Sequence, residues 1–221
     1  MLLSTRYQFL FIHIAKTGGT SIRAALRRRI WADPDRFFLW MVSRLSGWTG
    51  HRLGIKFPRH AKAIAAKEML PGDVFDRLFK FTFVRNPWDL QVSSFHHVRR
   101  ERPGMVAEAG VASFDDFIRW KFDPERPFHY ILDASTEPQH LSTIDLYGNC
   151  IVDFIGRYER LEADYHHVCG KIGLKPPPQL PHRRQSKSRG GYRAYYSDAT
   201  AELIGSRYQA DIENFGYRFD A

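Results

Sequence analysis

The chain has 221 residues, of which 43% are hydrophobic and 26% charged, a composition typical of a folded globular domain. No apolar run approaches the roughly 18 residues that cross a bilayer, and the two cysteines form no CxxC pair, which argues against a disulfide framework and a zinc site. The net charge of +9 indicates an anionic partner without choosing among nucleic acid, acidic polysaccharide, phospholipid and a charged nucleotide. The N-terminus shows no secretory signal, so we expect a cytoplasmic protein.

A strand, a glycine-containing loop and a helix open the chain. The nearly continuous apolar run over Tyr7–Ile14 predicts a short buried strand. Ile22, Leu26 and Ile30 recur at helical spacing and predict a helix over Thr20–Ile30. The loop between them holds a lysine, two glycines and three hydroxyl residues.

Strands and helices continue to alternate along the chain. The stretch "LFKFTFV" predicts a second strand over Leu78–Val84, and Pro87 suits the first turn of the helix that follows. Few regular signals occur over Trp31–Arg59. The other predicted elements are a helix over Ala61–Met69, a loop over Glu101–Gly110, a helix over Phe114–Phe122, a strand over Ile151–Ile155, a helix over Leu161–Ile172, a surface loop over Lys175–Gly191 and one helix over Asp198–Phe215.

This alternation predicts an α/β protein with a central, mostly parallel sheet covered by helices on both faces. The residues after the Lys175–Gly191 loop are too few for a second domain, so we expect a single domain over residues 1–221. Ligands of such sheets bind beyond the carboxyl ends of the strands. The loops after the first and second strands should therefore face one cleft.

The first of these loops, "AKTGGTS", has the composition of an anion cradle. Gly18 and Gly19 permit positive φ and close backbone approach, and amides at a helix N-terminus attract negative charge. Lys16 adds a full charge, and hydroxyl donors come from Thr17, Thr20 and Ser21. The alternative is a tight turn with a threonine helix cap. The loop is not a Walker A motif, because its lysine precedes the glycines.

The second loop, within "FTFVRNPWDLQVSSF", places Arg85 directly after a buried strand and Ser93 about two helical turns further on. The guanidinium of Arg85 offers a planar fork for a phosphate, and Ser93 offers a hydroxyl. The alternative is that Arg85 forms a structural ion pair with Asp89 and that Ser93 is a solvated helix residue.

Taken together, the stretches "HIAKTGGTSI" and "FTFVRNPWDLQVSSF" resemble the 5′-phosphosulfate and 3′-phosphate motifs of the sulfotransferases, especially the carbohydrate sulfotransferase branch and its bacterial relatives. "DFIGRYERLEADY" and the C-terminal stretch resemble that branch as well.

The resemblance implies a P-loop-like three-layer α/β/α fold and the donor 3′-phosphoadenosine 5′-phosphosulfate. It implies that Lys16 contacts the bridging oxygen and sulfuryl group, and that Arg85 and Ser93 hold the 3′-phosphate. The residues implied to bind the nucleotide are Lys16, Thr17, Gly18, Gly19, Thr20, Ser21, Arg85 and Ser93, with Ser186, Lys187 and Arg189 in a basic loop over Arg183–Arg193 that would close over it.

Sulfuryl transfer needs a base for the acceptor hydroxyl, and the resembling branch often uses a histidine between its two phosphate motifs. His60 is the favoured candidate, with His51 in reserve and Glu68 as an acidic alternative. His13, on the first strand, is expected to be structural. No metal is expected.

Two other classes of function remain open at this stage. A P-loop-like kinase would need a magnesium-binding hydroxyl residue after the lysine, and the lysine order here is wrong for it. A non-enzymatic basic module would bind polyanions through the net charge and the Arg183–Arg193 loop. The transferase hypothesis predicts a saccharide acceptor and no nucleic-acid partner. The identity of the acceptor and the oligomeric state stay open.

Overall fold

The computed structural model describes residues 1–30, 57–176, 180 and 191–220, with positions 41, 44, 45 and 48 described singly. The chain divides into two compact units. The first, here called the α/β unit, comprises Met1–Ile14, Gly18–Val84 and Ser142–Arg183. The second, here called the helical unit, comprises Ala15–Thr17, Arg85–Leu141 and Arg184–Ala221. The single-domain organisation expected from the sequence stays a prediction.

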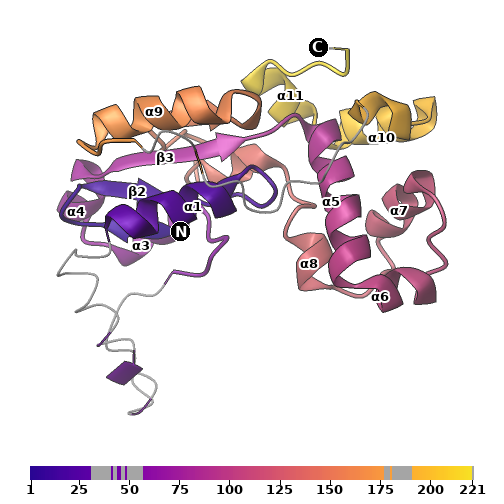
Figure 1. Ribbon diagram of the computed structural model, residues 1–221, viewed down its shortest axis with the longest axis horizontal. Coiled ribbons are helices and arrows are strands. Elements are labelled where there is room, and N and C mark those ends of the chain that lie inside the picture. Colours follow the sequence, from indigo (N-terminus) through magenta and orange to yellow (C-terminus); the bar gives the residue numbers. More distant parts are fainter. Residues whose placement is uncertain are drawn as a thin grey trace. The chain divides into compact units, whose positions relative to one another are not determined.

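A four-stranded sheet forms the centre of the α/β unit, in the order β1-β2-β3-β4. Its two central strands, β2 and β3, are labelled in Figure 1. Strands β2, β3 and β4 are parallel, and only β1 runs antiparallel to its neighbour. Phe81 of β3 pairs with Phe11 on one side and with Phe154 on the other. The strands span Leu2–Ser4 (β1), Phe9–Phe11 (β2), Phe79–Val84 (β3) and Phe154–Arg157 (β4).

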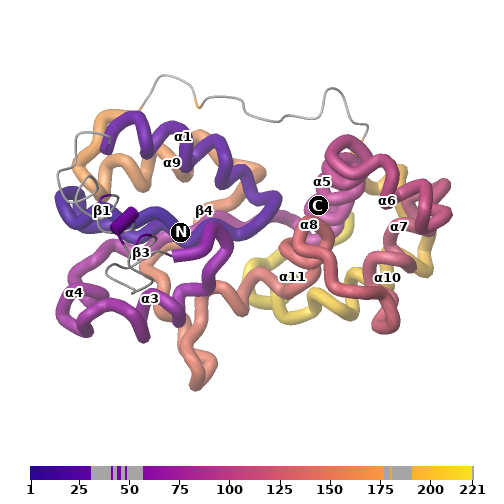
Figure 2. Tube along the Cα trace, turned by 90° about the horizontal axis from the view of Figure 1, so that it is seen from below, coloured from indigo at the N-terminus to yellow at the C-terminus, as the bar shows by residue number. Residues whose placement is uncertain are grey.

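Helices cover both faces of this sheet (Figure 2). Side chains of a strand alternate between the faces, so Phe9 and Phe11 pack with α1 and α9 while Leu10 packs with α3 and α4 on the opposite side. The three-layer α/β/α architecture with a mostly parallel sheet is confirmed; its P-loop-like character stays a prediction. The helices span Gly19–Arg29 (α1), Ala63–Met69 (α3), Gly72–Arg77 (α4) and Leu161–Lys171 (α9).

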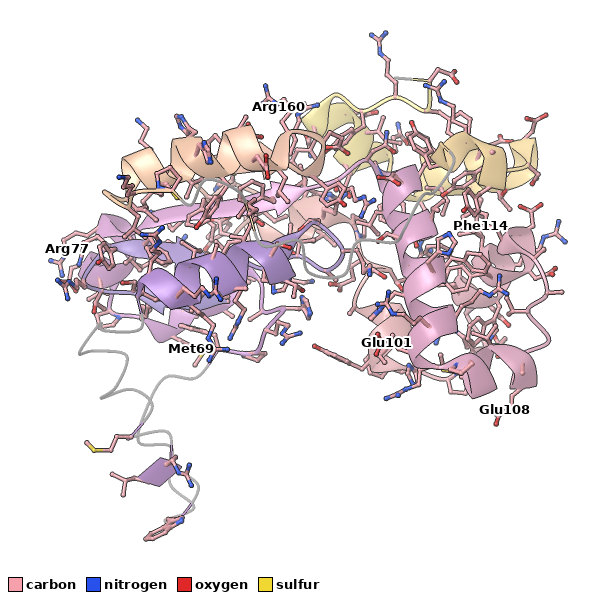
Figure 3. All side chains as sticks on the ribbon, viewed as in Figure 1. Met69, Arg77, Glu101, Glu108, Phe114 and Arg160 are labelled. Carbon is pink, nitrogen blue, oxygen red and sulfur yellow. The ribbon has the colours of Figure 1, made fainter. Side chains whose placement is uncertain are left out.

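The helical unit has its own aromatic core. The predicted apolar face of α5, formed by Trp88, Val92 and Phe95, packs with Phe114 at the start of α7 and with Tyr208. Phe114 is labelled in Figure 3. The helices span Pro87–Glu101 (α5), Pro103–Glu108 (α6), Phe114–Lys121 (α7), Tyr130–Asp133 (α8), Asp198–Arg207 (α10) and Gln209–Phe215 (α11), with short 3₁₀ turns at Gln139–Ser142 and Tyr192–Tyr195.

The start of α5 is fixed by local sequence. The side chain of Asn86 accepts a hydrogen bond of 3.0 Å from the backbone amide of Trp88, and Pro87 occupies the first helical turn, where its missing N–H is no loss. This cap sets the orientation of the helix immediately after Arg85, a residue of the predicted site.

Three local predictions were wrong in detail. The predicted loop over Glu101–Gly110 contains α6, because Pro103 stands at a helix start, where proline is tolerated. The third predicted strand lies at Phe154–Arg157 instead of Ile151–Ile155. The C-terminal helix is broken at Tyr208, whose backbone leaves the helical conformation and whose buried hydroxyl bonds to the carbonyls of Ser135 and Thr136.

Candidate functional site

The predicted "AKTGGTS" loop straddles the boundary between the two units. Ala15–Thr17 belong to the helical unit, and Gly18–Ser21 belong to the α/β unit. Thr17 and Ser21 are buried, whereas Lys16 and Thr20 are partly exposed.

In the α/β unit, the loop ends as a glycine-initiated helix. Gly18 is the N-cap of α1 with φ of 81°, a left-handed conformation that favours glycine. Its lack of a side chain means that the threonine cap considered from the sequence does not form. The first turn of α1 contains no acidic residue, so no carboxylate of that turn offsets the positive end of the helix dipole. This arrangement suits a bound anion.

The second glycine is required by close packing against a histidine. A Cβ atom added to Gly19 would lie 2.1 Å from Cδ2 of His13, closer than real atoms approach. His13 is 4% exposed, its ring stacks on Phe11 at 5.7 Å, and burial lowers its pKa to about 2. His13 is thus a neutral packing residue, as the sequence predicted.

His60, the predicted base, lies directly against His13. The two ring centroids are 4.7 Å apart, and Nδ1 of His60 is 2.8 Å from the backbone oxygen of His13. A carbonyl oxygen only accepts hydrogen bonds, so Nδ1 carries the proton and the neutral ring has its lone pair on Nε2. Burial lowers the pKa of His60, and the positive charge of Arg59 lowers it further. The hydrogen bond to the His13 carbonyl acts in the opposite direction. The ring is therefore held in the state that a general base needs at neutral pH.

In the helical unit, the other half of the loop meets Arg85. Nη1 of Arg85 donates a hydrogen bond of 3.0 Å to the backbone oxygen of Lys16. Lys16 has φ of 66°, and among the described residues it shares a positive φ outside glycine only with Gln8. A left-handed lysine costs about 1 kcal/mol and persists where surrounding contacts fix it. Within the helical unit, the Ala15–Thr17 part of the first predicted turn is thus bonded to Arg85 of the second.

The guanidinium of Arg85 also forms the ion pair considered as the alternative. Its Nη2 lies 2.6 Å from Oδ2 of Asp89, and its Nε donates to the same oxygen at 2.8 Å. Arg85 is 3% exposed. Ser93 is half-buried on α5, one turn beyond Asp89. A phosphate at this position would meet both a cation and a carboxylate, so Asp89 must share the arginine with any ligand.

The sequence did not predict the residues that bond to the backbone of Arg85. The side-chain amide of Gln139 accepts from the backbone N–H of Arg85 at 2.9 Å and donates to its carbonyl oxygen at 2.7 Å. The carboxylate of Asp211, fully buried on α11, accepts from the backbone amides of Gln139 and His140 and pairs with the His140 ring. No local motif marks Gln139 or Asp211 in the sequence.

The remaining predicted site residues contribute no contact to the two turns within the described part of the chain. His51, Ser186, Lys187 and Arg189 lie outside the described residues. Glu68, the acidic alternative for the base, is exposed on α3. Over the described ranges, no three His, Cys, Asp or Glu side chains are grouped to hold a metal ion, and no helix combines the length and apolarity that crossing a bilayer requires.

Comparison with known proteins gives a family model and several similar proteins. The family model described as "Sulfotransferase family" matches residues 1–218. Carbohydrate sulfotransferase 14 of Mus musculus is 26% identical over 230 residues, which cover 92% of this chain and 52% of that protein. Carbohydrate sulfotransferase 10 of Xenopus laevis is 25% identical over 178 residues, 66% of this chain and 50% of that protein.

An uncharacterized protein of Archaeoglobus fulgidus is 34% identical over 120 residues, 54% of this chain and 87% of that protein. This chain spans about half the length of the two carbohydrate sulfotransferases. No solved structure matches it.

Proposed function

Because the chain belongs to the sulfotransferase family, we propose that it transfers the sulfuryl group of 3′-phosphoadenosine 5′-phosphosulfate to a hydroxyl group of a saccharide. The hydrogen bond from Arg85 to the carbonyl of Lys16 carries this proposal. The donor has an anionic group at each end, and this contact sets the lysine proposed for one end beside the arginine proposed for the other. A chain that kept these turns apart could not grip one nucleotide with both.

The proposed donor contacts follow from the chemistry of the two turns. Lys16 contacts the bridging oxygen and sulfuryl group, where a fixed positive charge stabilises the charge that grows on the departing 5′-phosphate. The rest of the cradle is formed by Thr17, Gly18, Gly19, Thr20 and Ser21. Arg85 and Ser93 hold the 3′-phosphate, with Asp89 retaining one edge of the guanidinium. Ser186, Lys187 and Arg189 remain proposed contacts from the basic loop.

The proposed base is His60. The acceptor hydroxyl attacks sulfur while the bond from sulfur to the bridging oxygen breaks, with the two oxygens roughly in line. Nε2 of His60 takes the hydroxyl proton, and Nδ1 keeps its hydrogen bond to the His13 carbonyl. Because His13 packs against the first residue of α1, this base is anchored beside the proposed cradle.

A saccharide is the proposed acceptor class because two of the similar proteins are named carbohydrate sulfotransferases. Their names give no acceptor for this chain, which covers about half of either protein. Cytoplasmic localisation likewise stays a prediction.

The donor proposal is tested by thermal unfolding with 3′-phosphoadenosine 5′-phosphate, with ATP plus magnesium, with heparin, or with no addition. At 100 times its dissociation constant a ligand adds about 2.7 kcal/mol to the free energy of unfolding. We expect a clear rise in Tm with the bisphosphate alone and a much smaller one with ATP.

Transfer of radiolabelled sulfate from the donor to a panel of oligosaccharides then tests the reaction. Stabilisation by ATP and magnesium but not by the bisphosphate would support the kinase reading instead.

A further inference from the structure

We propose that Asp211 and Gln139 are positioning residues that act through Arg85 to hold Lys16 in its reactive orientation. This inference rests on the proposed function, because it assigns a role to Lys16 in sulfuryl transfer. The chain of contacts is continuous and lies entirely within the helical unit. It runs from α11 through the 3₁₀ turn at Gln139 to the residue after β3, and from there to the loop after β2.

The links in this chain are hydrogen bonds of 2.6 to 3.0 Å, and all of their residues are buried except Lys16, which is partly exposed. Oδ2 of Asp211 accepts from the backbone amide of Gln139 at 2.6 Å. The side-chain amide of Gln139 bonds to both backbone polar groups of Arg85, at 2.9 and 2.7 Å. Nη1 of Arg85 donates to the carbonyl of Lys16 at 3.0 Å. Exposed fractions are 0% for Asp211, 1% for Gln139 and 3% for Arg85.

The series of contacts ends at Lys16, whose backbone conformation depends on them. Lys16 adopts a left-handed backbone conformation without being glycine, a strain that surrounding contacts must hold in place. Its carbonyl is fixed by the guanidinium of Arg85, and that guanidinium is fixed on another edge by Asp89. The backbone of Arg85 is fixed by Gln139. Loss of the Gln139 bonds would therefore move Arg85 and loosen the Lys16 turn.

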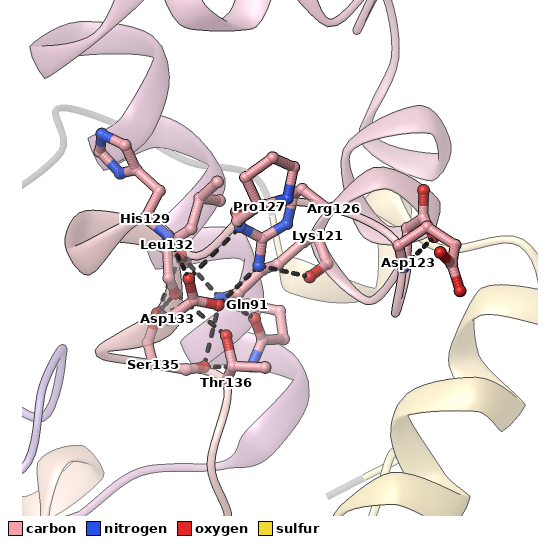
Figure 4. Close-up of polar contacts among 12 residues, drawn as sticks. Gln91, Lys121, Asp123, Arg126, Pro127, His129, Leu132, Asp133, Ser135 and Thr136 are labelled. Atoms are coloured by element: carbon pink, nitrogen blue, oxygen red, sulfur yellow. Dashed lines mark hydrogen bonds and ion pairs between the residues drawn. The ribbon is translucent and has the colours of Figure 1, made fainter.

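A second buried glutamine in the same unit provides a matched control. Gln91 is 0% exposed, and its Oε1 accepts from Nζ of Lys121 at 2.7 Å (Figure 4). Its Nε2 donates to the hydroxyl of Tyr208 at 2.8 Å. Like Gln139, it uses both ends of its amide in a buried network. It has no bond to Arg85, so its loss should affect stability without moving the Lys16 turn.

The first experiment compares Gln139→Met with Gln91→Met. Methionine has a similar length and lacks the amide, so both variants should unfold more readily. We expect Gln139→Met to lower kcat at saturating donor by about tenfold to a hundredfold, the scale that misplacement by an ångström costs. Gln91→Met should keep kcat within about twofold of wild type, after correction for the folded fraction. Equal losses of kcat in the two variants would overturn the positioning role.

Gln139→Glu supplies a readout that a purely structural role would not change. When protonated, the new carboxyl group can accept from the Arg85 amide and donate to the Arg85 carbonyl, as glutamine does. When ionised, it cannot donate, and it stands near the carboxylate of Asp211, which lies 3.4 Å from Nε2 of Gln139 in the native protein. We therefore expect kcat of this variant, relative to wild type, to fall as pH rises and to recover as pH is lowered. A ratio that does not change with pH would overturn the inference.

The outcomes separate this inference from the proposed function. If the wild-type protein transfers no sulfuryl group and does not bind 3′-phosphoadenosine 5′-phosphate, the proposed function fails first. If wild type transfers sulfate and both Gln139 variants match it after correction for folding, only the positioning role fails.

Discussion

The α/β unit holds its proposed catalytic group by ring packing and one hydrogen bond to a backbone carbonyl, whereas the helical unit holds its own by a chain of hydrogen bonds and an ion pair. In the α/β unit, His60 rests on the ring of His13, which in turn fits against a glycine backbone. In the helical unit, Lys16 is held by Arg85, whose backbone is bonded by Gln139 and whose side chain is paired with Asp89. The first arrangement depends on shape and the second on buried polar partners.

This difference predicts how each arrangement should respond to substitution. A packed contact is destabilised when a larger side chain is introduced, and it is less sensitive to the loss of a charged group. A buried polar network fails when one partner is removed, because the partners left behind cannot be solvated. Substitutions in the two units should therefore separate effects on stability, donor affinity and rate.

The largest effect is expected from His60→Ala in the α/β unit. Loss of a general base costs about 10²- to 10⁴-fold in rate, while donor binding should not depend on this ring. We expect kcat to fall by that factor and the dissociation constant of 3′-phosphoadenosine 5′-phosphate, measured by calorimetry, to change little. His166→Ala, an exposed histidine on α9, is the control and should behave as wild type. Full turnover by His60→Ala would remove His60 as the base.

The next effect is expected from Arg85→Ala in the helical unit. A hydrogen bond to a charged group contributes about 1.5–3 kcal/mol, so affinity for 3′-phosphoadenosine 5′-phosphate should fall by roughly 10- to 150-fold. Since Arg85 also holds the Lys16 carbonyl, kcat should fall as well. The exposed Arg119 of α7 provides the control, and Arg119→Ala should bind normally. Unchanged affinity in Arg85→Ala would show that its pairing with Asp89 is purely structural.

The sequence predicted those parts of the site that are set by neighbouring residues. The apolar run before Lys16 predicted a buried strand, the glycines predicted a turn into a helix, and Asn86-Pro87 predicted the start of α5. The ion pair of Arg85 with Asp89 was also considered from the sequence, and Asp89 stands in the first turn of the helix that begins two residues after Arg85.

The contacts that could not be predicted join residues far apart in the chain. Gln139 reaches Arg85 across 54 residues, and Asp211 reaches Gln139 across 72. Neither residue stands in a pattern of period or composition, because a buried polar link needs only one correctly placed side chain. The contact of His60 with the His13 carbonyl, 47 residues away, was missed for the same reason. Sequence reasoning selected His60 but could not show what fixes its tautomer.

A smaller effect is expected from adding a methyl group in the α/β unit. In Gly19→Ala the new Cβ would overlap the ring of His13, and overpacking of this kind costs about 1–3 kcal/mol. In Gly18→Ala the nearest atom is Cδ2 of Leu161 at 2.8 Å, the end of a flexible side chain, so the main cost is the left-handed backbone, about 1–2 kcal/mol.

Urea unfolding should separate these two causes. Gly18→Asn should recover part of the stability lost in Gly18→Ala, because asparagine tolerates a left-handed backbone. Gly19→Asn should recover none. Recovery at both positions would mean that packing against His13 does not limit residue 19.

The smallest effect concerns the pH dependence of folding in the packed arrangement. Burial lowers the pKa of His13 from its ordinary 6.5 to about 2, so between these values the unfolded chain binds a proton that the folded chain does not. The free energy of unfolding is therefore unaffected by His13 above pH 6.5 and falls below it, by up to about 1.4 kcal/mol per pH unit. Burial lowers the pKa of His60 as well, which adds a change of the same sign.

We expect urea midpoints to fall less steeply between pH 7 and 5.5 in His13→Gln than in wild type, with the exposed-site variant His166→Gln as the control. Equal slopes in His13→Gln and wild type would mean that His13 takes up a proton in the folded protein, which the packing of its ring against Gly19 and Phe11 should prevent.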